Sequence, residues 1–301
     1  MILTFTLGFC RSFIDAAELG MDAPELDVAK FIKGDPVSIK AGKGSQVTVV
    51  EFWATWCGPC KTSIPHLSEL QAKYKDRGVT IIGVSSETEA KVRPFVQSMG
   101  SKMDYTVAVD DNRSTFKRYM TAFNQSGIPT AFIVDKAGKL VWFGHPMSDL
   151  DGVLEQVVEG RFDLARYKVE RAKADAQRKA MGTYLNAIAS GEPDKATKQE
   201  GIDFVNDSDS PQVLNQFAWI ILTHSKVQYR DLPLALTAAK KAYDLTEGNN
   251  TAVTDTYARA LWDSGQKDEA IQFQREAVNR EKNGSQKAQL EKVLNSYLSS
   301  K

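Results

Sequence analysis

The sequence predicts two domains of different fold class, an α/β domain with a mixed sheet flanked by helices and, after it, an all-α domain. Between residues 20 and 160, short runs of β-branched and aromatic residues alternate with amphipathic stretches of helical period. Beyond residue 160 the chain is rich in charged residues and alanine and contains no run typical of a strand. The length of 301 residues also suits two domains, because one domain commonly holds roughly 100–200 residues.

The strands of the first domain are predicted from apolar and β-branched runs. Two runs are continuous, which is typical of strands buried on both faces, and two others flank a turn as a hairpin. The strands are expected over Val47–Trp53, Val79–Ser85, Tyr105–Val109, Thr130–Asp135 and Lys139–Phe143. The helices are expected over Pro59–Tyr74, Glu87–Met99, Arg113–Met120 and Asp149–Glu159. This order predicts a mainly parallel sheet that is covered on both faces and carries an antiparallel hairpin at one end.

The second domain has an internal period of 35 residues. The positions that recur, as pairs in chain order, are Trp219 and Thr254, Leu222 and Tyr257, Ala235 and Ala270, Ala239 and Gln274, and Ala242 and Ala277. Small residues at these spacings let two helices pack closely, and the period resembles that of tetratricopeptide repeats (TPR). An unrelated stack of α-hairpins is the alternative. We expect an N-terminal tail or degenerate signal over residues 1–19, the α/β domain over 20–160, a helical linker over 161–192 and TPR-like repeats over 193–301.

The charge balance restricts the partners of the protein. Lysine plus arginine and aspartate plus glutamate both number 38, so the chain lacks the basic excess typical of nucleic-acid or anionic-membrane binding. No apolar run is long enough for a transmembrane helix. The apolar start, MILTFTLGFC, lacks the basic segment of a complete signal peptide. We expect an extracytoplasmic location, periplasmic or secreted, with the cytoplasm as the alternative.

The three cysteines, Cys10, Cys57 and Cys60, are too few for a disulfide-stapled scaffold. A zinc site is not expected either, because no second cysteine pair or close histidine pair follows the C-x-x-C spacing. The Gly58-Pro59 pair between the cysteines predicts that a helix starts at this motif. The N-terminus of a helix lowers the pKa of a cysteine thiol, so we expect Cys57 to attack and Cys60 to resolve the mixed disulfide.

The segment Glu51–Lys61, EFWATWCGPCK, closely resembles the active-site strand and helix of the thioredoxin superfamily. Pro65 matches the proline inside that helix, and Gly127-Ile128-Pro129-Thr130 resembles the family's cis-proline loop. The additional segment between Glu87 and Met120 resembles the insertion of the TlpA/ResA-type redoxin branch, which is related to the AhpC/TSA proteins. The resemblance covers residues 20–160 and implies a thioredoxin-like fold.

The resemblance also implies roles for individual residues. Cys57, Cys60 and Glu51 would be catalytic, with Glu51 standing where thioredoxins carry a buried aspartate that takes the proton of the resolving cysteine. A carboxyl group in a buried strand is expected to have a raised pKa, which suits this role. The substrate would be bound by Trp56, Gly58, Pro59, Ile128 and Pro129. The TlpA/ResA branch often carries an acidic residue three positions after the second cysteine, whereas this chain has Ser63.

These features predict a thiol–disulfide oxidoreductase that needs no cofactor or metal. We expect it to reduce disulfides of a protein client held by the helical repeats, and to be recharged by a separate dithiol donor. One alternative is a peroxiredoxin-type antioxidant, although the Pro-x₃-Thr-x₂-Cys pattern of peroxiredoxins is absent around Cys57. The other is a TPR scaffold or co-chaperone with an incidental redox domain.

Overall fold

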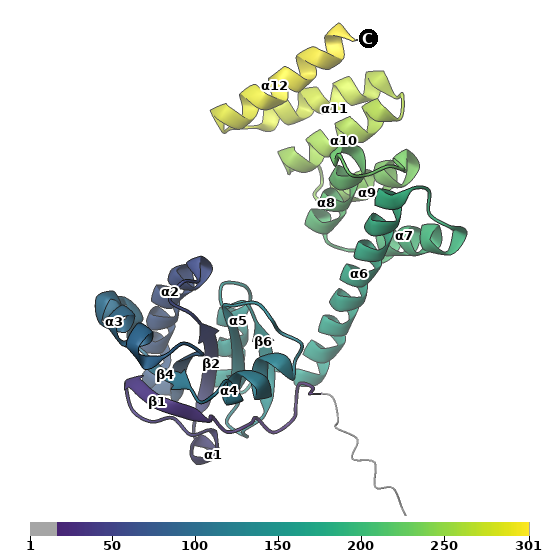
Figure 1. Ribbon diagram of the computed structural model, residues 1–301. Coiled ribbons are helices and arrows are strands. Elements are labelled where there is room, and N and C mark those ends of the chain that lie inside the picture. The colour runs from purple at the N-terminus through teal and green to yellow at the C-terminus, as the bar shows by residue number, and fades with distance from the viewer. Residues whose placement is uncertain (1–16, 301) are drawn as a thin grey trace, which may run out of the picture. The chain divides into compact units, whose positions relative to one another are not determined.

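The computed structural model describes residues 17–300, which form two compact units that meet in the chain between Lys168 and Val169 (Figure 1). The first unit is an α/β domain and the second is helical in its described part. Cys10 and the first sixteen residues of the expected N-terminal tail lie outside the described residues. No described helix is long and apolar enough to cross a membrane.

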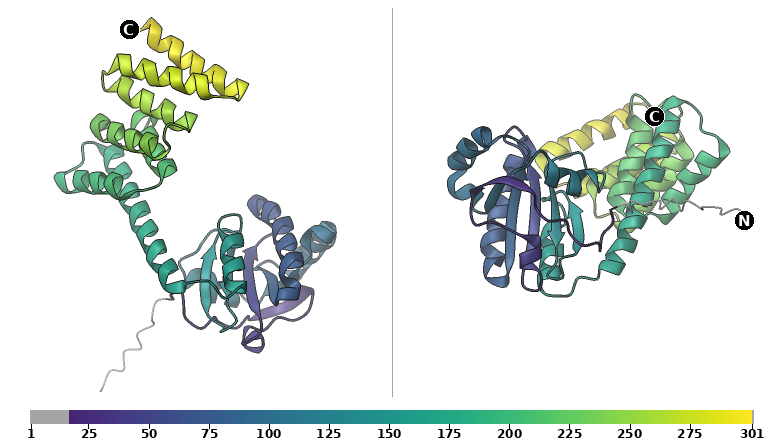
Figure 2. Two further views of the ribbon diagram at one scale, coloured as in Figure 1. Left: turned by 180° about the vertical axis from the view of Figure 1, so that it is seen from behind. Right: turned by 60° about the horizontal axis from the view of Figure 1, so that its bottom comes forward.

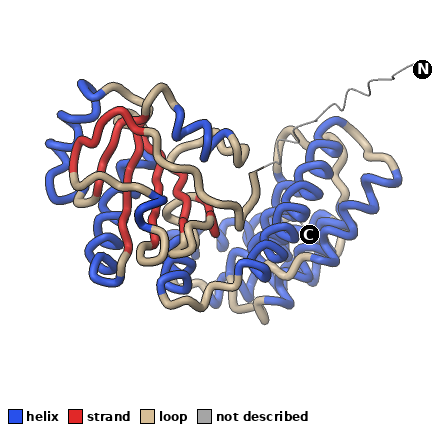
Figure 3. The backbone as a smooth tube through the Cα atoms, turned by 90° about the horizontal axis from the view of Figure 1, so that it is seen from below, coloured by secondary structure: helices blue, strands red, loops and turns tan. Residues whose placement is uncertain are grey.

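A mixed sheet forms the centre of the first unit (Figure 3). It has six strands in the order β1-β4-β3-β2-β5-β6. The strands are β1 (Val28–Lys33), β2 (Val47–Trp53), β3 (Val79–Ser85), β4 (Thr106–Asp110), β5 (Thr130–Val134) and β6 (Leu140–Gly144). β2, β3 and β4 run parallel, whereas β1 is antiparallel to β4, β5 to β2 and β6 to β5. The expectation of a mainly parallel sheet is therefore wrong. The sequence did not reveal β1, because its residues VAKFIK form no continuous apolar run and none of them is fully buried.

Helices cover both faces of this sheet (Figure 2). They are α1 (Ile39–Gly42), α2 (Gly58–Tyr74), α3 (Glu89–Met99), α4 (Ser114–Phe116) and α5 (Leu150–Val158). Two 3₁₀ turns follow α2 and α3 over Lys75–Arg77 and Gly100–Met103, and a π-helical turn follows α4 over Lys117–Thr121. α2, α3 and α5 share an apolar core with one face of the sheet, and α1 and the π-helical turn share a core with the other face.

The alternation of side chains along β2 places a carboxyl group beneath α2. Val49 and Trp53 lie in the core shared with α2, whereas Val50 and Phe52 lie in the core on the opposite face. Successive side chains of a strand point to opposite faces, so Glu51 points to the same side as Val49 and Trp53. Glu51 is completely buried there.

α2 begins directly after Cys57, which caps the N-terminus of the helix. Pro59 stands in the first turn, where the missing N–H group leaves no hydrogen bond unmade. The helix continues through Pro65 to Tyr74, and the chain then turns toward β3 at Gly78, whose φ of 77° is readily adopted by glycine. The strand, the loop and the helix start that carry the motif are therefore specified within a short stretch of sequence.

The second unit is built from helices that follow one another closely in the chain. They are α6 (Leu164–Ser190), whose first turn belongs to the first unit, α7 (Lys195–Asp207), α8 (Pro211–Thr223), α9 (Leu232–Leu245), α10 (Thr251–Asp263), α11 (Lys267–Arg280) and α12 (Gly284–Ser299). The C-terminal part of α6 shares a core with α7, α8, α9 and α10. Tyr184 and Ile188, which lie in the stretch expected to be a helical linker, are completely buried in this core. α11 and α12 form a smaller core of their own.

The two predicted repeat units correspond to the helix pairs α8–α9 and α10–α11. In the first helix of each pair, the equivalent positions differ from those expected. α9 and α11 begin 35 residues apart, at positions 232 and 267, but α8 and α10 begin 40 residues apart, at positions 211 and 251. The connection between α8 and α9, residues 224–231, is longer than the one between α10 and α11, residues 264–266, and this accounts for the difference. Trp219 is therefore not equivalent to Thr254: its side chain is 42% exposed, whereas Thr254 is completely buried. The residue 40 positions before Thr254 is Leu214, which is also completely buried.

Candidate active site

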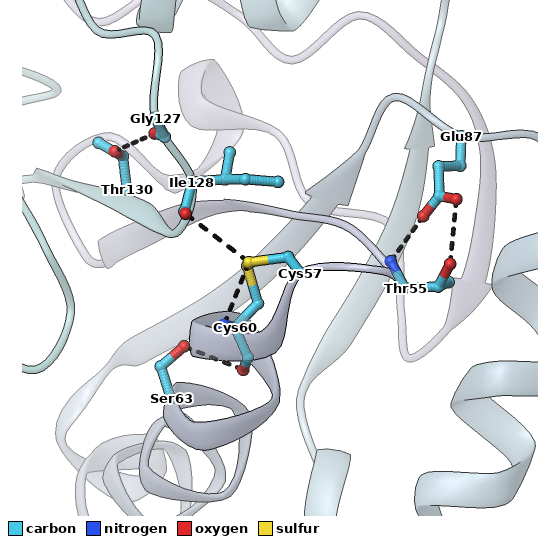
Figure 4. Close-up of a disulfide and its surroundings, with 8 residues drawn as sticks. All are labelled: Thr55, Cys57, Cys60, Ser63, Glu87, Gly127, Ile128 and Thr130. Atoms are coloured by element: carbon cyan, nitrogen blue, oxygen red, sulfur yellow. Dashed lines mark hydrogen bonds between the residues drawn. A yellow bond between two sulfur atoms is a disulfide. The ribbon is translucent and has the colours of Figure 1, made fainter.

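The two cysteines of the C-x-x-C motif form a disulfide at the N-terminus of α2 (Figure 4). The Cys57 Sγ–Cys60 Sγ bond is 2.02 Å long and the Cα atoms lie 5.3 Å apart. The Cys60 N–H group donates a hydrogen bond of 3.1 Å to Cys57 Sγ. Cys57 is 3% exposed and Cys60 is completely buried, so Cys57 presents the more accessible sulfur. Cys57 caps the N-terminus of α2, and such a position favours negative charge.

The loop before β5 lies against the disulfide. The Ile128–Pro129 peptide bond is cis, in agreement with the resemblance to the cis-proline loop. The Ile128 carbonyl oxygen lies 3.6 Å from Cys57 Sγ, and a hydrogen bond of 2.8 Å from the Thr130 hydroxyl to the Gly127 carbonyl closes the loop (Figure 4). A disulfide sulfur carries no hydrogen, so the contact at Ile128 becomes a hydrogen bond only when Cys57 is a thiol.

The surface around Cys57 is partly apolar. Trp56 is 71% exposed, which is unusual for so large a side chain. Gly58 and Pro59 are exposed as well, whereas Ile128 is half-buried and Pro129 is buried. The predicted substrate-binding residues thus border the disulfide from two segments that are about seventy residues apart in the sequence.

Glu87 holds the loop that precedes the motif, and sequence reasoning missed it. Its carboxylate accepts hydrogen bonds from the Thr55 backbone N–H, at 2.6 Å, and from the Thr55 hydroxyl, at 3.0 Å (Figure 4). The signal was present, because Glu87 follows the carboxyl end of β3 and Thr55 follows the carboxyl end of the parallel strand β2. Side chains just beyond parallel neighbouring strands meet at one edge of the sheet.

Glu51 is a buried carboxyl group without a hydrogen-bond partner in the described part of the chain. It stands in β2 between Gly83 of β3 and Ala131 of β5. Burial raises the pKa of Glu51 to about 8, and the Tyr105 hydroxyl group offsets a part of this rise. Tyr105 is near enough for an electrostatic interaction but makes no hydrogen bond with the carboxyl group. A pKa of about 8 suits a group that exchanges a proton near neutral pH.

The first unit is similar to domains of known proteins. The family model described as AhpC/TSA family matches residues 19–143. The thiol-disulfide oxidoreductase ResA of Bacillus thuringiensis (strain Al Hakam) is 36% identical over 147 residues, which are 47% of this chain and 80% of the relative. The ResA of Bacillus subtilis (strain 168) is 32% identical over 123 residues, 40% of this chain and 64% of the relative. This chain belongs to the family of ResA-like thiol-disulfide oxidoreductases.

A solved structure has a similar domain. It is the thioredoxin domain of a thiol-disulfide oxidoreductase from Bacteroides vulgatus, which is 26% identical, with a TM-score of 0.41 over 47% of this chain and 99% of the other. In our protein α7 to α12 lie beyond the residues that the AhpC/TSA family model matches.

Ser63 stands one turn into α2, at the position where the resemblance to the TlpA/ResA branch leads us to expect an acidic residue. Ser63 is completely buried, and its hydroxyl donates a hydrogen bond of 3.1 Å to the Cys60 carbonyl oxygen. Among the described residues, no three histidine, cysteine or acidic side chains are grouped so that they could hold a metal ion. Glu51 is a completely buried carboxyl group on the same side of β2 as α2, the helix that carries Cys60.

Proposed function

We propose that this oxidoreductase reduces disulfides of a protein client and that Cys57 is the residue that attacks them. The observation that supports this most is the position of Cys57 Sγ, at the N-terminus of α2 and 3.6 Å from the Ile128 carbonyl oxygen. An extended client segment beside the cis-proline loop would pair with the Ile128 backbone and bring its disulfide to Cys57. The exposed Trp56 would supply apolar contact to that segment.

The reaction proceeds in two exchanges. The Cys57 thiolate attacks one client sulfur, a mixed disulfide forms, and the other client sulfur leaves as a thiolate that takes up a proton. Cys60 then loses its proton and attacks Cys57 Sγ, which forms the Cys57–Cys60 disulfide and releases the second client thiol. Two electrons pass to the client, and a dithiol donor protein must return two electrons to the enzyme before the next cycle.

Glu51 is the proposed base for the second exchange. As a carboxylate it would take the proton of the Cys60 thiol, and the buried acid so formed is favoured by the same burial that raises the pKa of Glu51 to about 8. Cys60 is completely buried, so bulk water has little access to its proton. A base within the core is therefore more effective than solvent.

The helical unit is the proposed binding site for the client. This proposal is supported by large apolar side chains that are exposed on a unit outside the matched redox domain. The main example is Trp219 on α8, which is 42% exposed. Tryptophan is enriched among residues that dominate protein–protein binding. Replacing Trp219 by serine should lower capture of the client roughly tenfold while the reaction with a small disulfide stays unchanged.

The experiment that tests the reductase function is trapping with the Cys60→Ser variant of the full chain. Without the resolving thiol, the mixed disulfide between Cys57 and the client persists and is recovered on a non-reducing gel. The Cys57→Ser variant is the matched control and should trap nothing at Cys60, which is buried. Failure of Cys60→Ser to trap any protein, combined with failure of the wild type to reduce insulin disulfides, would overturn the proposal.

A further inference from the structure

Three buried polar side chains gather around a glycine on the α2 side of the sheet. Glu51 pairs with Gly83 in the parallel register of β2 and β3. A Cβ atom at Gly83 would lie 2.9 Å from Trp53 Nε1 and 3.0 Å from Tyr105 Cε2, so both side chains occupy the space that a larger residue would fill. The Glu51 carboxyl oxygens, Trp53 Nε1 and the Tyr105 hydroxyl are all buried and make no hydrogen bond with described residues.

Buried polar groups without hydrogen bonds lower the stability of the folded protein, so their presence calls for a functional explanation. An unpaired polar group in a protein interior destabilises the folded state, and apolar side chains of the same shape would avoid that cost. The packing of Tyr105 does not require its hydroxyl group, because a phenylalanine ring would fill the same space. The Tyr74 hydroxyl is buried and unpaired as well, but only the Tyr105 hydroxyl interacts electrostatically with Glu51, and this neighbour points to a role other than packing.

The chemistry of the two groups matches in both protonation states. A phenol donates a hydrogen bond to a carboxylate and accepts one from a carboxylic acid, so Tyr105 can serve Glu51 before and after proton transfer. Burial and the neighbouring Glu51 hold the pKa of Tyr105 well above its ordinary value, so the phenol keeps its own proton throughout. Tyr105 therefore cannot replace Glu51 as the base and can act only through it.

We propose that Tyr105 is a positioning residue: when Glu51 is ionised, the Tyr105 hydroxyl group stabilises its carboxylate and keeps it ready to take the proton of the Cys60 thiol. This inference rests on the proposed role of Glu51 as the base. In the step concerned, the proton passes from Cys60 Sγ to a Glu51 oxygen, the Cys60 thiolate attacks Cys57 Sγ, and the client sulfur leaves with the bonding electron pair. The Tyr105 hydroxyl group stabilises the carboxylate before the transfer.

The test measures the second exchange with 5,5′-dithiobis(2-nitrobenzoate) as the disulfide. The full chain is used in its reduced form, in a Cys10→Ser background, so that Cys57 and Cys60 are the only thiols. Attack by Cys57 releases one thionitrobenzoate, and attack by Cys60 releases the second in a slower, separately timed phase. The rate of this second phase is recorded by stopped flow between pH 5 and pH 10.

The variant Tyr105→Phe keeps the ring and removes only the hydroxyl group. Because that hydroxyl lowers the pKa of Glu51, its loss should move the rising limb of the pH profile to higher pH and make the second phase roughly three- to tenfold slower below the midpoint. Glu51→Gln should abolish the inflection, and Tyr105→Phe should add nothing in that background. The control is Tyr74→Phe, since Tyr74 is also completely buried in this core with an unpaired hydroxyl group, and its profile should match the wild type.

The possible results distinguish a failure of the Tyr105 role from a failure of the dithiol mechanism. If the wild type releases the first thionitrobenzoate but never the second, the dithiol mechanism itself fails. If both phases occur and Tyr105→Phe keeps the wild-type midpoint, the positioning role is wrong. The role is also wrong if Tyr105→Phe shifts the profile equally in the Glu51→Gln background, because Tyr105 would then act independently of the carboxyl group.

Discussion

Replacing Glu51 by glutamine removes a buried titrating group and keeps its size. In the folded protein the pKa of Glu51 is about 8, against an ordinary value of 4.5. Between these two values the folded protein retains a proton that the unfolded chain has released, so the free energy of unfolding falls as the pH rises. The slope is about 1.4 kcal/mol per pH unit, and from pH 5 to pH 8 the wild type should lose roughly 4 kcal/mol through this group alone.

The Glu51→Gln variant should lack this loss. Near pH 5 both side chains are neutral, so the two proteins should have similar stability, and the variant should become progressively more stable than the wild type up to about pH 8. All other titrating groups are common to both proteins and cancel in the comparison. The difference in unfolding free energy between the two proteins therefore reports the Glu51 carboxyl group alone.

Urea titrations of the oxidised full-chain proteins at a series of pH values provide the assay. Each sample is probed by a hydrogen-exchange pulse at one fixed pH, followed by mass spectrometry of a peptide that contains β2, so that the signal reports the redox unit. A difference in unfolding free energy between wild type and variant that stays constant from pH 5 to pH 9 would refute the reasoning. It would mean that Glu51 ionises at the same pH in the folded and unfolded states.

Two further predictions concern stability and use the same urea assay. Glu87→Gln should lower the free energy of unfolding of the redox unit by about 1–2 kcal/mol, because one amide oxygen cannot replace the carboxylate that binds both the Thr55 N–H and its hydroxyl; an unchanged urea midpoint would contradict this. Gly201→Ala should destabilise the helical unit by about 1–3 kcal/mol, since the new Cβ would lie 2.5 Å from Tyr184 Cδ2. The matched control is Gly182→Ala, whose new Cβ has no atom within 4 Å and which should stabilise α6 by about 0.5–1 kcal/mol. If the free energy of unfolding changes in the same direction in both variants, the packing explanation is wrong.

Much of the redox domain was predictable because its signals are local. β2 and β3 were predicted with their observed bounds, since a continuous apolar run needs no information from elsewhere in the chain. The start of α2 at the motif follows from the proline in its first turn. The edge strand β1 was missed because none of its residues is fully buried and two are exposed, so its composition resembles that of a loop. The antiparallel direction of β1 against β4 depends on a pairing between segments about eighty residues apart, which no local pattern encodes.

In the helical unit, the sequence period did not predict all of the equivalent positions. The small residues of α9 and α11 recur at the expected period of 35, but the length of the connection between α8 and α9 shifts the register of the preceding helix. A fixed period therefore selected Trp219, which is exposed, in place of the buried Leu214. Loop length varies with little thermodynamic cost, so a repeat can keep its packing while its sequence period changes.

By itself, the sequence determined the chemistry of this protein: a cysteine pair at a helix start, a carboxyl group in a buried strand and a proline loop that resembles those of thioredoxins. Only the tertiary structure decided which other groups act on that chemistry. Glu87 binds the loop before the motif, and Tyr105 and Gly83 shape the surroundings of Glu51. The physical reason is that the helix start and the strand are specified by neighbouring residues, whereas the environment of a buried carboxyl group is built from strands that meet only when the sheet has formed.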